Sequence, residues 1–142
     1  MDRPIYTPPT GIPQGPGPNR EIYNLMGDAH VYTLLEDFYG ELEQSSIRQL
    51  FQSDMIEASQ RSADFFVSLL GGPPRYAQKY GPPRMRARHL PFKIDEQARQ
   101  VWLACFNKVM DRAVEQHNFP PQHLEGFRNW LDEFSAWMVN TK

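Results

Sequence analysis

The chain has 142 residues, with 15 basic and 17 acidic side chains and a net charge of −2; this length is typical of one domain, and the charge balance argues against a nucleic-acid partner. Its 40% apolar and 13% aromatic residues are enough to bury a core, which excludes disorder over most of the chain. The single cysteine excludes an internal disulfide framework, and without an apolar run of about 18 residues no membrane span is expected. Together with an N-terminus unlike a signal peptide, these features favour a cytoplasmic location.

The first 19 residues differ in composition from the rest. Six of the 13 prolines lie between Pro4 and Pro18, mixed with three glycines. Such a segment holds neither a helix nor a central strand, so residues 1–19 are predicted to form an extended arm and residues 20–142 the folded domain. Two roles for the arm stay open, a solubilising tail and a proline-rich ligand for a partner.

Two stretches without proline, Arg20–Gly72 and Lys93–Phe119, carry helical patterns. Apolar residues recur with helical spacing from Val31 to Leu42, from Met55 to Leu69, from Ala98 to Ala113 and from Leu124 to Met138. A short turn is predicted at 47–51. No stretch shows the alternation of a strand, so the sequence predicts an all-α fold of about four main helices.

The starts of these helices have candidate capping residues. Asp28 is the candidate N-cap of the first helix, Asp54 or Ser53 of the second, and Asp95 of the third. The second helix is predicted to end at the pair of glycines at 71–72, which two prolines follow.

The segment between the two proline-free stretches is strongly basic. Residues 75–93 hold six of the 15 basic side chains, no acid and His89, one of four histidines. A proline-bounded segment of this length in a small helical domain usually binds something. Three interpretations stay open: a solvated loop, a contact with nucleic-acid phosphates, or the surroundings of a buried cofactor whose metal His89 ligates.

The cofactor hypothesis fits the neighbours of His89. A porphyrin is a flat apolar disc with two carboxylates at one edge, so it needs apolar walls and cations at the rim. Arg84 and Arg88 lie one helical turn apart and suit the rim, while Phe92, Ile94 and Trp102 follow the histidine and suit the walls. A neutral imidazole whose far nitrogen meets a backbone carbonyl is expected, and the short turn 85–90 is able to supply this contact.

At this point the run 71-GGPPRYAQKYGPPRMRARHLPFKI-94 resembles the truncated haemoglobins, and the group called class II or O-type fits best. Members of that group show Gly-Gly-Pro, a Tyr, and Arg-x-Arg-His-x-Pro-Phe, with a Trp 13 residues after the histidine; here Trp102 follows His89 at that distance. The pair Phe38-Tyr39 and the later Phe51 look like further family positions. The resemblance covers roughly residues 22 to 140.

The resemblance implies a truncated-globin two-over-two helical sandwich around one haem b. By position, His89 looks like the iron ligand on the proximal side, and Tyr39 and Trp102 look like hydrogen-bond donors to a gas on the distal side. Ala58 stands where many globins have a distal histidine. Ser62 departs from the family pattern, which more often has Leu or a longer polar residue at this position, and its short hydroxyl is able to bond a carbonyl of its own helix instead.

Further cofactor contacts follow from the same resemblance. Phe51 corresponds to an aromatic that wedges the haem, and Phe65 and Phe66 look like the distal lining. Arg88 is the first choice for a propionate partner, with Tyr76 and Arg86 as weaker candidates.

The function implied is reversible binding of oxygen or another diatomic gas, with redox chemistry on nitric oxide or peroxide as an extension that needs an unidentified electron donor. Neither nucleic acid nor a membrane is an expected partner, and a monomer or a homodimer is expected. The alternative is a cofactor-free helical adaptor that holds a protein partner with its basic loop and proline arm. The visible spectrum of the purified protein separates the two.

Overall fold

The computed structural model describes residues 3–51 and 54–142, and every regular element within these ranges is helical. This confirms the predicted all-α fold class. The helices are α1 (Ile22–Met26), α2 (Asp28–Glu43), α3 (Met55–Leu69), α4 (Arg75–Tyr80), α5 (Met85–His89), α6 (Glu96–Gln116) and α7 (Leu124–Met138), with two 3-10 turns, η1 (Arg48–Leu50) and η2 (Pro121–His123).

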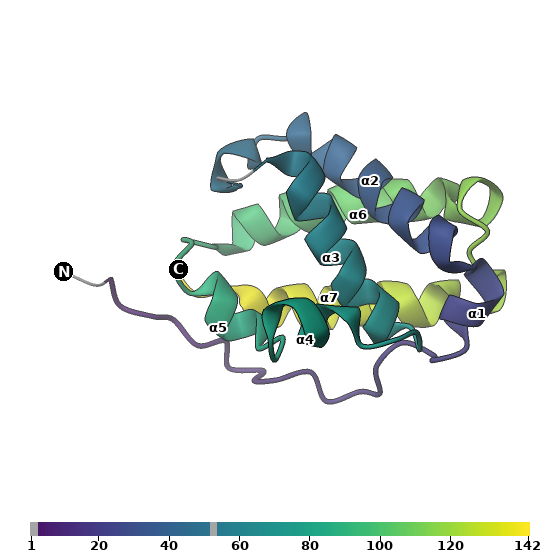
Figure 1. Cartoon of the computed structure of the whole chain (residues 1–142). Helices are drawn as coiled ribbons and strands as arrows, with labels where there is room; N and C mark the ends of the chain where they lie inside the picture. Colours follow the sequence, from purple (N-terminus) through teal and green to yellow (C-terminus); the bar gives the residue numbers. More distant parts are fainter. Residues whose placement is uncertain (1–2, 52–53) are drawn as a thin grey trace.

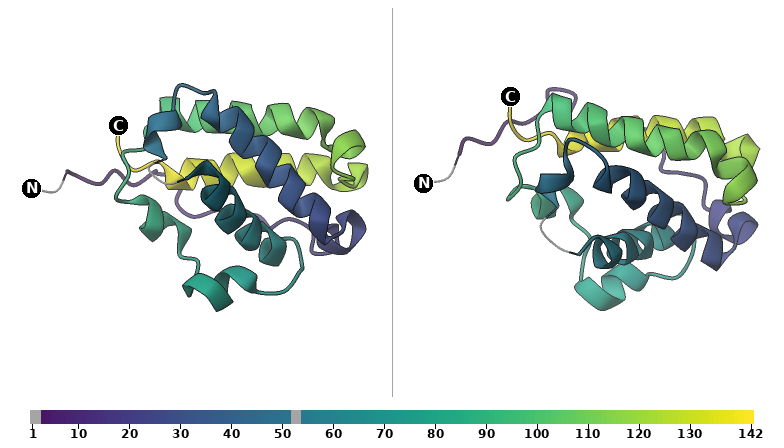
Figure 2. Two further views of the ribbon diagram at one scale, coloured as in Figure 1. Left: turned by 45° about the horizontal axis from the view of Figure 1, so that its top comes forward. Right: turned by 90° about the horizontal axis from the view of Figure 1, so that it is seen from above.

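Two pairs of long helices make up the fold. Helix α2 packs against α3 and α6, and α6 packs against α7. Figure 1 shows α3 crossing in front of α6 and α7, and Figure 2 shows α6 and α7 running side by side. The short helices α4 and α5 follow α3 and connect it to α6 along the outside of the pairs (Figure 1).

Phenylalanines from all four long helices meet in the core. The rings of Phe38 and Phe106 stack with 4.0 Å between their centroids, and both side chains are buried. Phe66 from α3 and Phe127 from α7 lie within 6 Å of Phe106. Burying aromatic side chains provides a large part of the free energy of folding, so this cluster holds the two helix pairs together.

Two of the predicted caps are confirmed and one is wrong. The Asp54 side chain accepts hydrogen bonds from the backbone amides of Ile56 and Glu57, and Asp95 accepts one from the amide of Ala98. Asp28 is the first helical residue of α2 and not its cap, because its carboxylate is taken up by the Tyr23 hydroxyl at 2.6 Å and by Arg75. The alternative cap Ser53 lies outside the described residues.

Gly71 allows the chain before α1 to pass close to the end of α3. Its φ angle is +107°, and a Cβ atom there would lie 1.9 Å from the carbonyl oxygen of Arg20. The backbone amide of Tyr23 donates to the carbonyl of Leu70 at 3.0 Å, so α1 begins against this close approach. Only glycine adopts this conformation without strain and also leaves room for the crossing chain.

A polar cluster ties α2 to the C-terminal part of α6. Arg112 donates to both carboxylate oxygens of Asp37, and Nε2 of His117 lies 2.8 Å from the same carboxylate. The other ring nitrogen of His117 lies 3.1 Å from the Thr33 hydroxyl. The hydrogen bonds from Arg112 hold the pKa of Asp37 below its ordinary value of 3.8.

This lowered pKa predicts an acid-sensitive contribution to stability. The contribution is complete above the unfolded-state pKa near 3.8 and is lost as the pH falls through the folded pKa of Asp37. We expect Asp37→Asn to lower the free energy of unfolding by about 1 kcal/mol at neutral pH, and to flatten its decline below pH 3.8. Urea unfolding of both proteins over a series of pH values measures this.

The matched control is Asp111→Asn. Asp111 also pairs with an arginine, Arg128, but its side chain is 73% exposed, against 22% for Asp37. Solvent screens the exposed pair, so this change should leave the decline of the free energy of unfolding at low pH almost unaltered. Equal effects of the two substitutions would show that the Asp37 cluster has no special role.

Candidate functional site

A cavity of about 510 Å³ lies between the two helix pairs and the α4–α5 segment. Its volume falls within the range of small-molecule and cofactor sites. Twelve of the predicted site residues, all between residues 39 and 102, line this cavity. They are Tyr39, Phe51, Ala58, Ser62, Phe65, Phe66, Tyr76, Arg88, His89, Phe92, Ile94 and Trp102. Arg84 and Arg86 are the two predicted residues that the structure does not bring to this lining.

His89 faces the cavity from the last residue of α5. Its Nδ1 lies 2.6 Å from the carbonyl oxygen of Met85, one turn earlier. Because a carbonyl only accepts, Nδ1 carries the proton and the neutral ring keeps a lone pair on Nε2. Burial lowers the pKa of His89, which favours this neutral form. An imidazole held in this way is suited to ligate a metal through Nε2.

Three polar groups face the cavity from α2, α3 and α6. Burial raises the pKa of Tyr39, so its phenol keeps the proton and acts as a donor. Ser62 hydrogen-bonds the Tyr39 side chain, which connects the two hydroxyls across α2 and α3. Trp102 lines the same cavity from α6 and packs edge-on against Phe38, with 5.3 Å between ring centroids.

The two arginines of the family motif have different roles. Arg88 lines the cavity, and its guanidinium donates to the carbonyls of Tyr80, Pro82 and Pro83 at 2.7–2.9 Å, 5.2 Å above the ring of Tyr76. It therefore brings a fixed positive charge to the cavity mouth.

Arg86 contacts residues near both ends of the chain instead. Its guanidinium donates to the carbonyls of Tyr6, Trp137 and Val139 and stacks 4.5 Å from the Trp137 ring. Arg84, also expected at the rim, is the N-cap of α5 in a left-handed conformation and does not line the cavity.

Two further arginines line the cavity and were not among the predicted residues. Arg61 lies on the face of α3 that also carries Ala58 and Ser62, and its charge lowers the pKa of the Tyr39 phenol against the larger effect of burial. Arg99 lies one turn before Trp102 on α6. Helical spacing from the predicted residues was the signal that would have found both.

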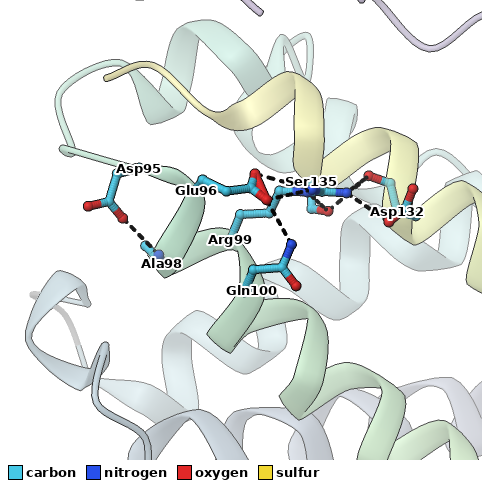
Figure 3. Close-up of polar contacts among 7 residues, drawn as sticks. All are labelled: Asp95, Glu96, Ala98, Arg99, Gln100, Asp132 and Ser135. Carbon is cyan, nitrogen blue, oxygen red and sulfur yellow. Dashed lines mark hydrogen bonds and ion pairs between the residues drawn. The ribbon is translucent and has the colours of Figure 1, made fainter. Parts of the chain in front are cut away.

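Arg99 joins α6 to α7 beside the cavity (Figure 3). Its guanidinium donates to the Ser135 hydroxyl at 3.0 Å, to the Asp132 carboxylate at 2.7 Å and to Glu96 at 2.9 Å. Two carboxylates therefore neutralise this charge. We infer that Arg99 holds α6 to α7 beside the cavity, and that Arg61 and Arg88 bring positive charge to its lining.

Comparison with known proteins identifies the family. Residues 21–140 match the family model of the bacterial-like globins. A group 2 truncated hemoglobin from Bacillus subtilis is 34% identical over 90 residues, which cover 63% of this chain and 68% of that protein. The chain belongs to the group II truncated haemoglobins.

Solved structures of truncated haemoglobins and related globins confirm the predicted two-over-two sandwich. Phosphate-bound Hell's gate globin IV superposes with a TM-score of 0.81 at 37% identity, over 90% of this chain and 79% of that chain. The truncated oxygen-avid haemoglobin from Bacillus subtilis superposes with a TM-score of 0.75 at 30% identity, over 83% of this chain and 98% of that chain. Within residues 3–51 and 54–142, no helix is both long and apolar enough to cross a membrane.

Membership of this globin family implies haem binding, and the residues of the cavity fit that group. Its walls are aromatic and aliphatic, as a porphyrin ring requires. Arg61 and Arg88 offer charge for the propionates, and the neutral His89 offers a lone pair for the iron.

Proposed function

We propose that this truncated haemoglobin holds haem b with His89 as the iron ligand and reversibly binds oxygen or another diatomic gas. The observation that carries the proposal is the neutral, carbonyl-anchored His89 on an apolar cavity that Tyr39, Ser62 and Trp102 also line. Haem, when bound, supplies an iron centre with a coordination position for a gas. The oxygen-avid relative from Bacillus subtilis supports oxygen as the gas.

Each side chain of the cavity has a part in this function. The Met85 carbonyl fixes the ring orientation of His89 and increases the basicity of Nε2. The Tyr39 hydroxyl and the Trp102 indole N–H donate hydrogen bonds towards the gas, and Ser62 orients the Tyr39 hydroxyl. Phe65 and Phe66 keep water out of the distal side.

The rim residues hold the carboxylates of the cofactor. Arg88 and Arg61 attract the propionates electrostatically, and Tyr76 supports the Arg88 guanidinium from below. Redox turnover of nitric oxide or peroxide would use the same cavity, with electrons from a separate donor.

The cavity favours this function over that of a cofactor-free adaptor. An adaptor gains nothing from a void of about 510 Å³ between its helices, because empty apolar space lowers the free energy of unfolding. The proline arm and the basic segment, on which the adaptor hypothesis depended, are instead bonded to the domain itself.

The absorption spectrum tests the proposal directly. We expect the purified protein to bind one haem per chain, to show a strong Soret band, and to form a ferrous complex with oxygen that reverses when oxygen is removed. A folded protein, helical by circular dichroism, that stays colourless after incubation with haem would contradict the proposal. Titration with haem at micromolar concentrations measures the stoichiometry.

A further inference from the structure

The helix that carries His89 is too short to hold its own position. Helix α5 has five residues, and its N-cap Arg84 makes no capping hydrogen bond. Isolated helices below about 12 residues are marginal in water. The last carbonyls of a helix also need partners from elsewhere. The position of His89 therefore depends on what binds the carbonyls at and after the end of α5.

Asn140 binds this segment from the C-terminal end of the chain. Its side chain is fully buried, and its Nδ2 donates to the carbonyls of His89 at 3.1 Å and Phe92 at 2.9 Å. Its Oδ1 accepts from the amide of Ile94 at 3.1 Å, and its own amide donates to the Ile94 carbonyl at 2.9 Å. One side chain thus ties three residues of the His89 segment together.

Arg3 binds the same segment from the N-terminal arm. Its guanidinium donates to the carbonyls of Leu90 and Phe92, both at 2.8 Å, and to the Asn140 carbonyl at 3.2 Å. The Tyr6 amide donates to the same Asn140 carbonyl at 2.9 Å. Figure 1 shows the arm starting beside α5 and the C-terminus and running along the domain to α1.

Arg86 closes the arrangement from α5 itself. It donates to the Tyr6 carbonyl at 2.9 Å and to the Val139 carbonyl at 2.9 Å, so the arm, α5 and the C-terminal residues are bonded pairwise. The planar guanidinium of arginine carries several N–H donors and binds several carbonyls at once. The compact ammonium group of lysine does not reproduce this geometry.

We propose that Arg3 and Tyr6 of the arm, together with Asn140, form a clamp that fixes α5 and so sets the orientation of His89 towards the cavity. Arg3 and Asn140 are positioning residues, because they act through the carbonyls of the His89 segment. The effect of the clamp on haem rests on the proposed function, whereas its effect on the backbone does not.

Hydrogen exchange of the haem-free protein tests the clamp alone. Arg3 is only partly buried, so Arg3→Ala removes its bonds without opening the core. We expect the amides of residues 88–94 to exchange at least about tenfold faster, because the loss of one charge-assisted hydrogen bond has an effect of about this size and Arg3 makes three. The free energy of global unfolding should fall by no more than the same amount, and amides elsewhere in the chain that exchange through other local openings should keep their rates. Arg3→Lys should restore only part of the protection.

The matched control is Arg20→Ala. Arg20 also donates from the chain before α1 to a backbone carbonyl, that of Ser68 at 3.2 Å, but far from α5. Its loss should leave exchange at 88–94 unchanged. Exchange at 88–94 that is the same in Arg3→Ala as in the wild type would overturn the clamp.

The haem-bound protein gives the second readout. In Arg3→Ala we expect haem to transfer to an excess of apomyoglobin several times faster, and the iron–histidine stretching band of the ferrous protein to broaden, while Arg20→Ala matches the wild type. Unaltered transfer and an unaltered band would show that the clamp does not orient His89. A wild type that binds no haem would overturn the proposed function and leave the exchange result standing.

Discussion

His89→Gly is expected to abolish haem binding in buffer, and imidazole added at millimolar concentration is expected to restore it. The substitution removes the ring that faces the cavity and leaves a space of its size beside the Met85 carbonyl. Free imidazole fits that space, donates to the same carbonyl and offers the same lone pair. Haem titration followed at the Soret band, with and without imidazole, measures both effects.

His30→Gly is the control for this substitution. The Nδ1 of His30 also contacts a carbonyl one turn earlier, that of Met26 at 2.8 Å, but His30 does not line the cavity. Glycine in α2 costs about 1 kcal/mol of stability, yet haem binding should remain. Full haem binding by His89→Gly without imidazole would place the iron ligand elsewhere and contradict the assignment.

The resemblance to the truncated haemoglobins predicted most of the cavity lining, and helical spacing explains why the residues of each helix face the cavity together. Ala58, Ser62 and Phe65 follow one another at three- and four-residue steps on α3, so placing one of them places the others. The same holds for Trp102 on α6, the helix that Asp95 caps as predicted. Local rules of this kind need no knowledge of the rest of the fold.

The directions of the arginines were not predictable from local rules. Arg86 and Arg88 are two residues apart on α5. The Arg88 guanidinium turns towards carbonyls five to eight residues earlier in the chain, whereas that of Arg86 turns towards carbonyls that the tertiary fold brings near it. For Arg86 these carbonyls belong to residues 50 or more positions away. Likewise, Asp28 is not a cap because Arg75, 47 residues later, competes for its carboxylate.

The arm illustrates the same limit. Its prolines correctly exclude a helix, since residues 3–19 are extended or irregular. Composition does not reveal that Arg3 donates hydrogen bonds to the carbonyls of Leu90 and Phe92, just after α5. Contacts of this sequence separation come from the three-dimensional fold, and they gave Asn140 a role that no motif indicates.

Tyr39→Phe is expected to speed oxygen dissociation about 10- to 100-fold, the range that the loss of a charge-assisted hydrogen bond of roughly 1.5–3 kcal/mol gives. Oxygen held at a ferrous haem iron would gain negative charge, and the protonated hydroxyl of the buried Tyr39, which lines the cavity, would stabilise that charge. Carbon monoxide draws little charge, so its dissociation should change far less. Stopped-flow replacement of oxygen by carbon monoxide measures the rate.

Tyr32→Phe is the matched control, because it removes a hydroxyl from the same helix that bonds Asp64 at 2.5 Å and does not line the cavity. Ser62→Ala tests the orientation of the Tyr39 hydroxyl and should give a smaller increase than Tyr39→Phe. If Trp102 donates to the same oxygen, the effects of Tyr39→Phe and Trp102→Phe will not add, since each donor polarises one ligand. Equal oxygen dissociation rates in Tyr39→Phe and Tyr32→Phe would show that the Tyr39 hydroxyl does not reach the gas, and would leave Trp102 to provide the distal hydrogen bond.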